Sequence, residues 1–184
     1  MNVGWLAPQL RTDRLVIRPF AVSDLAAVHA YAQGYQAERY GSWRGGNTPS
    51  DVARYIADTV ARYGRPPRCD LGVTLDGQLV GGVAFRQVWV APTQVEIGWV
   101  IHPRLAGHGV AREAVGALID HIYAAFPDMI RVEARVRADD TAGHRLLGAQ
   151  GFQREGVLRH GGGDVDAELF GLLRHERTPA VASG

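Results

Sequence analysis

The run Arg104-Leu105-Ala106-Gly107-His108-Gly109-Val110-Ala111 has the composition of an anion-binding turn at the start of a helix. Its glycines allow the backbone to turn sharply and to approach a ligand closely. The first amide N–H groups of the helix that follows have no partner within that helix, so they point at whatever lies in front of it. We expect a pyrophosphate to fit there, with Arg104 either adding a charged contact or lying in solvent as an ordinary loop arginine.

The elements that must position this turn alternate between strands and helices. Alternating or continuous apolar residues predict strands at residues 14–20, 71–75, 79–85, 94–101, 130–136 and 167–173. Apolar residues at helical spacing predict four helices. The first is capped by Ser23, and the others run from residue 48 to about 64, from 107 to about 126, and from 142 to about 150. The pair Asp76-Gly77 predicts a tight hairpin, and the capping pair Thr48 and Asp51 predicts a helix start.

Length and charge exclude several classes of protein. The 184 residues suffice for one domain with its own core, which we expect over residues 1–177, with a disordered tail at 178–184. Lys plus Arg is 20 against 19 for Asp plus Glu, so no overall basic field exists to hold nucleic acid. No apolar run approaches the roughly 20 residues that cross a bilayer, and residues 1–8 do not resemble a signal peptide. We therefore expect a cytoplasmic protein without nucleic-acid or membrane partners.

The residues that could form covalent or metal-based sites are sparse. Cys69 is the single cysteine and has no activating histidine beside it, which favours a structural thiol. No serine lies in a Gly-x-Ser-x-Gly elbow, so nothing suggests a covalent acyl-enzyme. The histidines lack the helical spacing of a metal site, and we expect no metal.

Several segments together resemble the GNAT superfamily of N-acetyltransferases, and they are most similar to its ribosomal-protein alanine N-acetyltransferase branch. The Arg-x-x-Gly-x-Gly pattern of residues 104–109 is the acyl-coenzyme-A motif of that superfamily. The other matching segments follow in the expected order: Leu15-Val16-Ile17-Arg18-Pro19-Phe20, Glu96-Ile97-Gly98-Trp99-Val100, Arg112-Glu113-Ala114-Val115 and Gly151-Phe152-Gln153-Arg154-Glu155-Gly156. The resemblance covers most of the chain. It implies a single α/β domain with a mixed, mostly antiparallel sheet that splays in the middle and is flanked by helices.

The resemblance also implies acetyl-CoA as cosubstrate and a place for it. The donor would lie where the strand that ends at Ile101 separates from the strand that begins near residue 130. Its pantetheine amides would pair with the main chain of Trp99, Val100 and Ile101, as a peptide adds to a sheet edge. Its pyrophosphate would meet the amides of Gly107, His108, Gly109, Val110 and Ala111.

The chain departs from the family pattern Asn-x-Ala-Ser-x-Arg, for which it has Asp140-Thr141-Ala142-Gly143-His144-Arg145. Asp140 and Arg145 are carried over as donor-binding residues, although Asp140 adds a negative charge and has no amide to donate. The family serine lies near the thiol of the coenzyme and could protonate it, which Gly143 cannot do. Its neighbour His144 points about 100° away on the helix, and we expect a surface histidine there.

Transfer of an acyl group to an amine needs a group that accepts the proton, and Glu96 is the leading candidate because it precedes the donor-binding segment. The alternative role of Glu96 is structural, in a cross-strand pair or with an arginine. Main-chain N–H groups near Val100 would polarise the carbonyl. We expect Tyr40, Trp43 and Trp89 to line the acceptor pocket, unless these aromatic side chains instead anchor their loops in the core.

The first hypothesis is therefore an acetyl-CoA-dependent N-acetyltransferase that transfers the acetyl group directly in a ternary complex. The acceptor would be a primary amine, either a protein N-terminus, as in the branch that the chain resembles, or a small molecule. The alternative is a non-catalytic CoA-binding sensor or scaffold, for which Asp140 and Gly143 are the support. A homodimer is compatible with either hypothesis.

Overall fold

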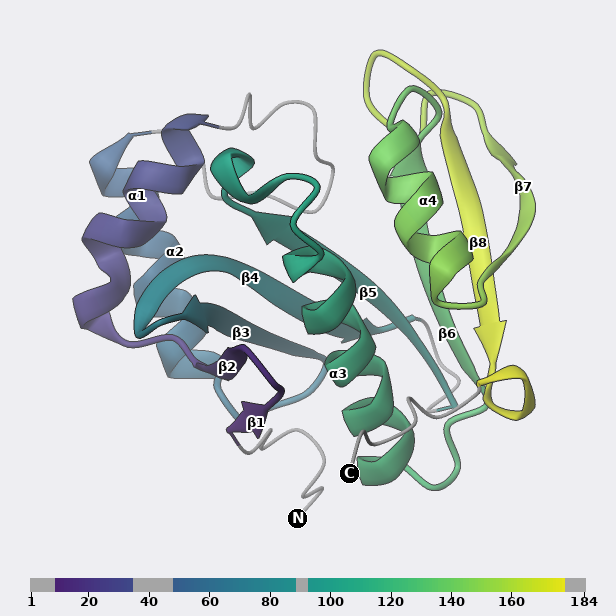
Figure 1. Cartoon of the computed structure of the whole chain (residues 1–184), viewed down its shortest axis with the longest axis horizontal. Helices are drawn as coiled ribbons and strands as arrows, with labels where there is room; N and C mark the ends of the chain where they lie inside the picture. Colours follow the sequence, from purple (N-terminus) through teal and green to yellow (C-terminus); the bar gives the residue numbers. More distant parts are fainter. Residues whose placement is uncertain (1–8, 35–47, 89–92, 178–184) are drawn as a thin grey trace.

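A computed structural model describes residues 9–34, 48–88 and 93–177, which form an eight-stranded sheet with helices on both faces (Figure 1). The strand order is β1-β2-β3-β4-β5-β6-β8-β7. The strands are β1 (Leu10–Arg11), β2 (Leu15–Pro19), β3 (Arg68–Leu75), β4 (Gln78–Gln87), β5 (Gln94–Ile101), β6 (Arg131–Arg137), β7 (Gln153–Leu158) and β8 (Ala167–Leu173). Among these strands, β5 and β6 pair in parallel and the other neighbours pair antiparallel. The mixed, mostly antiparallel sheet that the resemblance implied is thereby confirmed.

The helices divide between the two faces of the sheet. They are α1 (Leu25–Gly34), α2 (Pro49–Arg62), α3 (Val110–Ala125) and α4 (Thr141–Ala149), with short 3₁₀ turns η2 (Val22–Asp24), η4 (Pro103–Leu105) and η5 (Arg174–Glu176). In Figure 1, α3 crosses in front of the central strands and α4 lies in front of β6 and β8. Helices α1 and α2 pack on β3 and β4 through a separate apolar cluster. No helix in the described ranges is long and apolar enough to cross a membrane.

The larger of the two cores lies between α3 and the sheet. Val115, Leu118, Ile119 and Ile122 of α3 are fully buried against side chains such as Phe85 of β4. Burial of each such side chain contributes roughly 1.5–3 kcal/mol. The apolar stripe that predicted this helix is therefore the face that it buries, although its first helical residue is Val110 rather than Gly107.

Local signals in the sequence decide several turns. Asp76 and Gly77 both have positive φ, 50° and 76°, as the tight hairpin between β3 and β4 requires. At the start of α2, the Asp51 amide donates to Thr48 Oγ1 at 3.2 Å, which confirms the expected cap. The expectation for Ser23 is wrong. Its segment begins with η2, where the Asp24 carboxylate accepts a hydrogen bond from the Ala21 amide at 2.8 Å.

Two strands were not predicted. Strand β1 has only two residues, and β7 is an exposed edge strand with a bulge between Arg154 and Gly156, so neither carries a strong apolar pattern. Strand β7 pairs with β8, and the glycine-rich segment 159–166 forms the turn between them. Gly161-Gly162-Gly163-Asp164 therefore joins two strands and does not precede a helix, as a phosphate-binding loop would.

We expect Asp24→Asn to lower the free energy of unfolding by about 2 kcal/mol at pH 7, because a carboxylate hydrogen-bonded to a charged partner is lost. Arg18 donates to both Asp24 oxygens, at 2.7 and 2.8 Å. Burial raises the pKa of Asp24, but the bonds from Arg18 and Ala21 outweigh it, and the net pKa lies below 3.8.

The contribution of Asp24 is therefore present above pH 3.8 and is lost as the pH falls through the lowered pKa of the folded state. Urea denaturation at pH 7 and at pH 2.5 should show a difference between wild type and variant that shrinks in acid. The exposed Asp58→Asn is the matched control. An equal difference at both pH values would contradict this account.

Candidate functional site

The glycine turn lies between η4 and α3 and has a left-handed backbone conformation at both of its glycines. Gly107 and Gly109 have φ of 79° and 78°, the left-handed region that other residues rarely adopt. Gly109 is the N-cap residue of α3 and has no side chain to satisfy the first helical amides. A Cβ added at Gly107 would meet nothing within 4 Å, so the conformation rather than crowding requires glycine there.

The amides of this turn are mostly available to a ligand. Within the described residues, nothing accepts a hydrogen bond from the backbone N–H of Gly107, Gly109, Val110 or Ala111. The amide of His108 is different, because it donates to the Leu105 carbonyl at 3.2 Å. We call the amides of residues 107 and 109–111 the cradle. They lie at the positive end of the α3 dipole, which suits an anion.

Strands β5 and β6 separate close to the cradle. Their parallel pairing begins at Gln94 with Arg131 and ends at Ile97 with Ala134. Beyond that point β5 continues to Ile101 paired only with β4, and β6 continues to Arg137 paired only with β8. In Figure 1 the two strands diverge toward the end at which α3 begins. Trp99 and Val100, near the end of β5, therefore present one backbone edge without a strand partner among the described residues.

Glu96 lies on the sheet face opposite α3, one residue before the pairing ends. Its neighbours Val95 and Ile97 are buried in the α3 core, and side chains alternate along a strand. Arg86 Nη2 lies 2.6 Å from Glu96 Oε2, and Arg135 Nε lies 3.6 Å from the same oxygen. No described residue hydrogen-bonds Oε1. One oxygen of Glu96 is thus held by arginines and the other is available.

A second carboxylate stands beside Glu96. Glu133 is its register partner across the parallel pair, and the Glu133 side chain is buried. Arg131 Nε lies 3.2 Å from Glu133 Oε2, and Arg135 Nη2 lies 3.8 Å from Glu133 Oε1. Arg135 therefore lies between two carboxylates at the point where the sheet opens. In the sequence, Glu133 is only one of the polar residues that alternate with apolar ones in the strand predicted at residues 130–136.

A recess lies next to these carboxylates, on the same face. Its floor is a row of register partners, Asp70 on β3, Ala84 on β4 and Gly98 on β5. Because Ala84 and Gly98 have little or no side chain, they leave space above the sheet for a small recess beside Asp70. Tyr31 of α1 and Tyr55 of α2 line the recess from above the sheet.

The polar groups of the recess are mutually bonded. Arg68 Nε donates to Asp70 Oδ2 at 2.7 Å, and the Tyr55 hydroxyl donates to Asp70 Oδ1 at 3.4 Å. Burial raises the pKa of Tyr55 above its usual 10.0, so the phenol keeps its proton. Sequence reasoning missed these residues, although a charged Asp70 beside the apolar run of residues 71–75 was an available signal.

Asp140 is the N-cap residue of α4. The Asp140 carboxylate accepts a hydrogen bond from the Gly143 amide at 3.0 Å. A Cβ at Gly143 would lie 2.7 Å from Asp140 Oδ2 and 2.7 Å from Val136 Cγ1, so a side chain at this position would require both neighbours to shift. His144 Nε2 lies 3.6 Å from Glu168 Oε2 of β8, and the His144 ring packs on Phe170. Arg145 is exposed.

The other residues singled out from the sequence are one loop arginine, three aromatic residues and the single cysteine. Arg104 is exposed at η4, beside the cradle. Tyr40, Trp43 and Trp89 lie outside the described residues, so their assignment to the acceptor pocket stays a prediction. Cys69 is buried in the α3 core, as expected for a structural thiol. The described residues bring together no cluster of three metal-ligating side chains.

The eight-stranded mixed sheet with helices on both faces, which opens between β5 and β6 near the start of α3, is the arrangement of an acetyltransferase fold. The profile of the acetyltransferase (GNAT) domain matches residues 14–153 of the chain. The protein belongs to this family and is an N-acetyltransferase.

Several known proteins are similar to the chain in sequence or in structure. The uncharacterised N-acetyltransferase YoaA of Bacillus subtilis is 27% identical over 173 residues, which cover 91% of this chain and 97% of that protein. The Mycobacterium smegmatis RimJ structure, in complex with CoA-disulfide, has a TM-score of 0.80 at 23% identity and covers 94% of this chain and 90% of that one. The ribosomal-protein-S5-alanine acetyltransferase of Vibrio fischeri has a TM-score of 0.77 at 18% identity, with coverage of 94% and 100%.

Proposed function

We propose that this N-acetyltransferase uses acetyl-CoA as donor and transfers the acetyl group directly to a primary amine in a ternary complex. The observation that carries the proposal is the cradle next to the separated strands. Unpaired amides at a helix start and an unpaired strand edge are the two features that a pyrophosphate joined to a chain of amides requires. The RimJ structure that contains a CoA species supports the choice of donor.

Residues of the cradle and of β5 would hold the donor. The amides of Gly107, Gly109, Val110 and Ala111 fit a pyrophosphate, with Arg104 as a nearby cation. The edge of Trp99, Val100 and Ile101 fits the pantetheine amides. Because the His108 amide is bonded to Leu105, we propose that His108 contributes no amide to the phosphates. The donor would supply a thioester, whose carbonyl carbon the amine attacks and whose thiol leaves.

Glu96 would act on the acceptor side. An ammonium cannot attack a carbonyl, so the amine must lose its proton before or during the transfer. We propose that Glu96 accepts this proton, directly or through a water molecule, at its available Oε1. Arg86 and Arg135 would hold the carboxylate in place through Oε2. Main-chain N–H groups near Val100 would stabilise the negative charge that develops on the carbonyl oxygen.

The acceptor that we propose is a primary amine, which would approach Glu96 from the sheet face that carries the recess. A protein N-terminus is supported by the ribosomal-protein acetyltransferase among the similar structures, which at 18% identity shares the fold. A small-molecule amine is the other candidate. The recess has hydrogen-bonding groups at Arg68, Asp70 and Tyr55, which would bind polar groups next to the reacting amine.

Incubation of the protein with acetyl-CoA and a set of amines tests the proposal. The set should contain peptides with N-terminal alanine or serine, a polyamine and an aminoglycoside. We expect acceptor-dependent release of thiol and a product heavier by one acetyl group in mass spectrometry. Binding of CoA in calorimetry without any acetylated product would favour the alternative, a non-catalytic CoA sensor. Absence of CoA binding would overturn both.

A further inference from the structure

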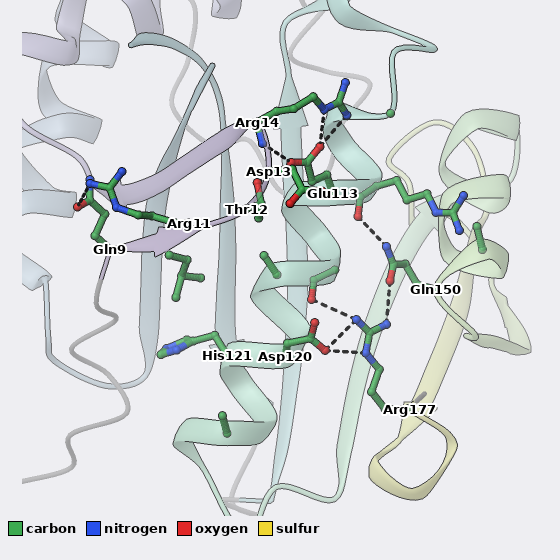
Figure 2. Close-up of a pocket in the computed structure, with 17 residues that line it drawn as sticks. Gln9, Arg11, Thr12, Asp13, Arg14, Glu113, Asp120, His121, Gln150 and Arg177 are labelled. Carbon is green, nitrogen blue, oxygen red and sulfur yellow. Dashed lines mark hydrogen bonds and ion pairs between the residues drawn. The ribbon is translucent and has the colours of Figure 1, made fainter. Parts of the chain in front are cut away.

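Glu113 lies in the first turn of α3, close behind the cradle, and it is tied to the N-terminal segment of the chain (Figure 2). Its Oε1 accepts hydrogen bonds from Thr12 Oγ1 at 2.5 Å and from the Arg14 amide at 3.1 Å. Its Oε2 accepts from Arg14 Nε at 2.7 Å. Both carboxylate oxygens are thus occupied by donors from the loop between β1 and β2. We call Thr12, Arg14 and Glu113 the clasp.

The clasp also reaches the cradle itself. Arg14 Nη1 donates to the His108 carbonyl at 3.1 Å. In a trans peptide the C=O of one residue and the N–H of the next point in opposite directions. A His108 carbonyl held toward Arg14 therefore directs the Gly109 N–H away from Arg14, and no described residue accepts a hydrogen bond from it.

The clasp also controls the charge near the cradle. Burial raises the pKa of Glu113, but the bonds from Thr12 and Arg14 outweigh it, so the net pKa is lowered and the carboxylate is ionised. An unpaired carboxylate in the first turn of α3 would oppose an anion at the start of that helix. The guanidinium of Arg14 lies 2.6 Å from Glu113 Oε2 and compensates this charge.

We propose that Arg14 is a positioning residue for the donor phosphates, which holds the Gly109 amide outward and neutralises Glu113. This inference rests on the proposed function, because it needs a donor pyrophosphate at the cradle. Arg14 does not itself have to touch the ligand. Its effect passes through the His108 carbonyl and through Glu113, which lies 99 residues away in the sequence.

The proposal is tested by titrating four proteins with CoA in a calorimeter. They are the wild type, Arg14→Ala, the double variant Arg14→Ala/Glu113→Gln, and Arg11→Ala. We expect Arg14→Ala to raise the Kd for CoA about ten-fold, since a carboxylate is left uncompensated and an amide loses its orientation. The double variant should bind about three-fold more tightly than Arg14→Ala, because Gln keeps the shape of Glu113 without its charge. Thermal unfolding verifies that each variant is folded.

Arg11→Ala is the matched control, since Arg11 is an exposed arginine of β1 whose side chain donates to Gln9 Oε1 and takes no part in the clasp. It should leave the Kd unchanged. A merely structural Arg14 predicts that the double variant binds no better than the single one, and that result overturns the proposal. Equal Kd values for wild type and Arg14→Ala also overturn it. Failure of the wild type to bind CoA would instead overturn the proposed function, and this inference with it.

Discussion

Replacement of Gly107 and Gly109 by valine should raise the Kd for CoA by a factor on the order of 100 or more. Both glycines have φ near 78°, a conformation that costs other residues about 1–2 kcal/mol each and β-branched residues more. At Gly109 a Cβ would also lie 3.4 Å from Arg14 Nη2. The turn must then relax toward negative φ, which reorients the amides that the cradle depends on. Calorimetric titration of the double variant with CoA measures the loss.

Gly148→Val provides the control for this substitution. Gly148 lies in α4, has no positive φ, and has nothing within 4 Å of an added Cβ. It tests whether a valine side chain in place of a glycine elsewhere affects CoA binding in general. We expect CoA binding by this variant to equal that of the wild type. Unchanged CoA binding by the Gly107→Val/Gly109→Val protein would show that the donor phosphates do not lie at the cradle.

Features that depend on neighbouring residues could be predicted from the sequence. The turn of the β3–β4 hairpin follows from Asp76-Gly77, because both positions require a positive φ that these residues tolerate. The buried face of α3 follows from apolar residues at helical spacing. The position of the cradle follows from two glycines between a strand and that helix. In each case the physical cause acts within a few residues of chain.

Features that depend on distant pairing could not be predicted in this way. Glu96 and Glu133 become neighbours only through the register of the parallel pair β5–β6. Asp70 and Gly98 share a row only because β3, β4 and β5 pair in one particular register. The Asp76-Gly77 turn fixes the register of β3 with β4, but periodicity along each strand does not give the offset of β5 from β4 or of β6 from β5.

The departure at Gly143 has a physical reason that the sequence alone does not reveal. The Asp140 carboxylate occupies the space that a side chain at position 143 would need, with Oδ2 only 2.7 Å from the Cβ position. Aspartate at 140 and glycine at 143 are therefore compatible with each other, and a serine would displace Asp140 or Val136. Whatever group protonates the departing thiol, residue 143 does not provide it.

Replacement of Glu96 by glutamine should lower kcat by about 10²-fold or more, with little change in the KM for acetyl-CoA. Glutamine keeps the size of the side chain and an acceptor for Arg86, but it cannot take a proton from the amine. The donor site lies on the cradle and on the β5 edge, so the loss should fall on the chemical step. Steady-state kinetics with an acceptor found in the amine set measures both constants.

Arg86→Ala separates this role from a structural one. If Glu96 only anchors its strand through Arg86, then loss of either partner removes the same 2.6 Å ion pair and the two variants should have similar kcat values and similar unfolding midpoints. If Glu96 accepts the proton, Arg86→Ala keeps the carboxylate and should retain far more activity than Glu96→Gln. Glu133→Gln tests the neighbouring carboxylate in the same assay. If this variant loses more kcat than Glu96→Gln, the proton acceptor is Glu133 on β6 rather than Glu96 on β5.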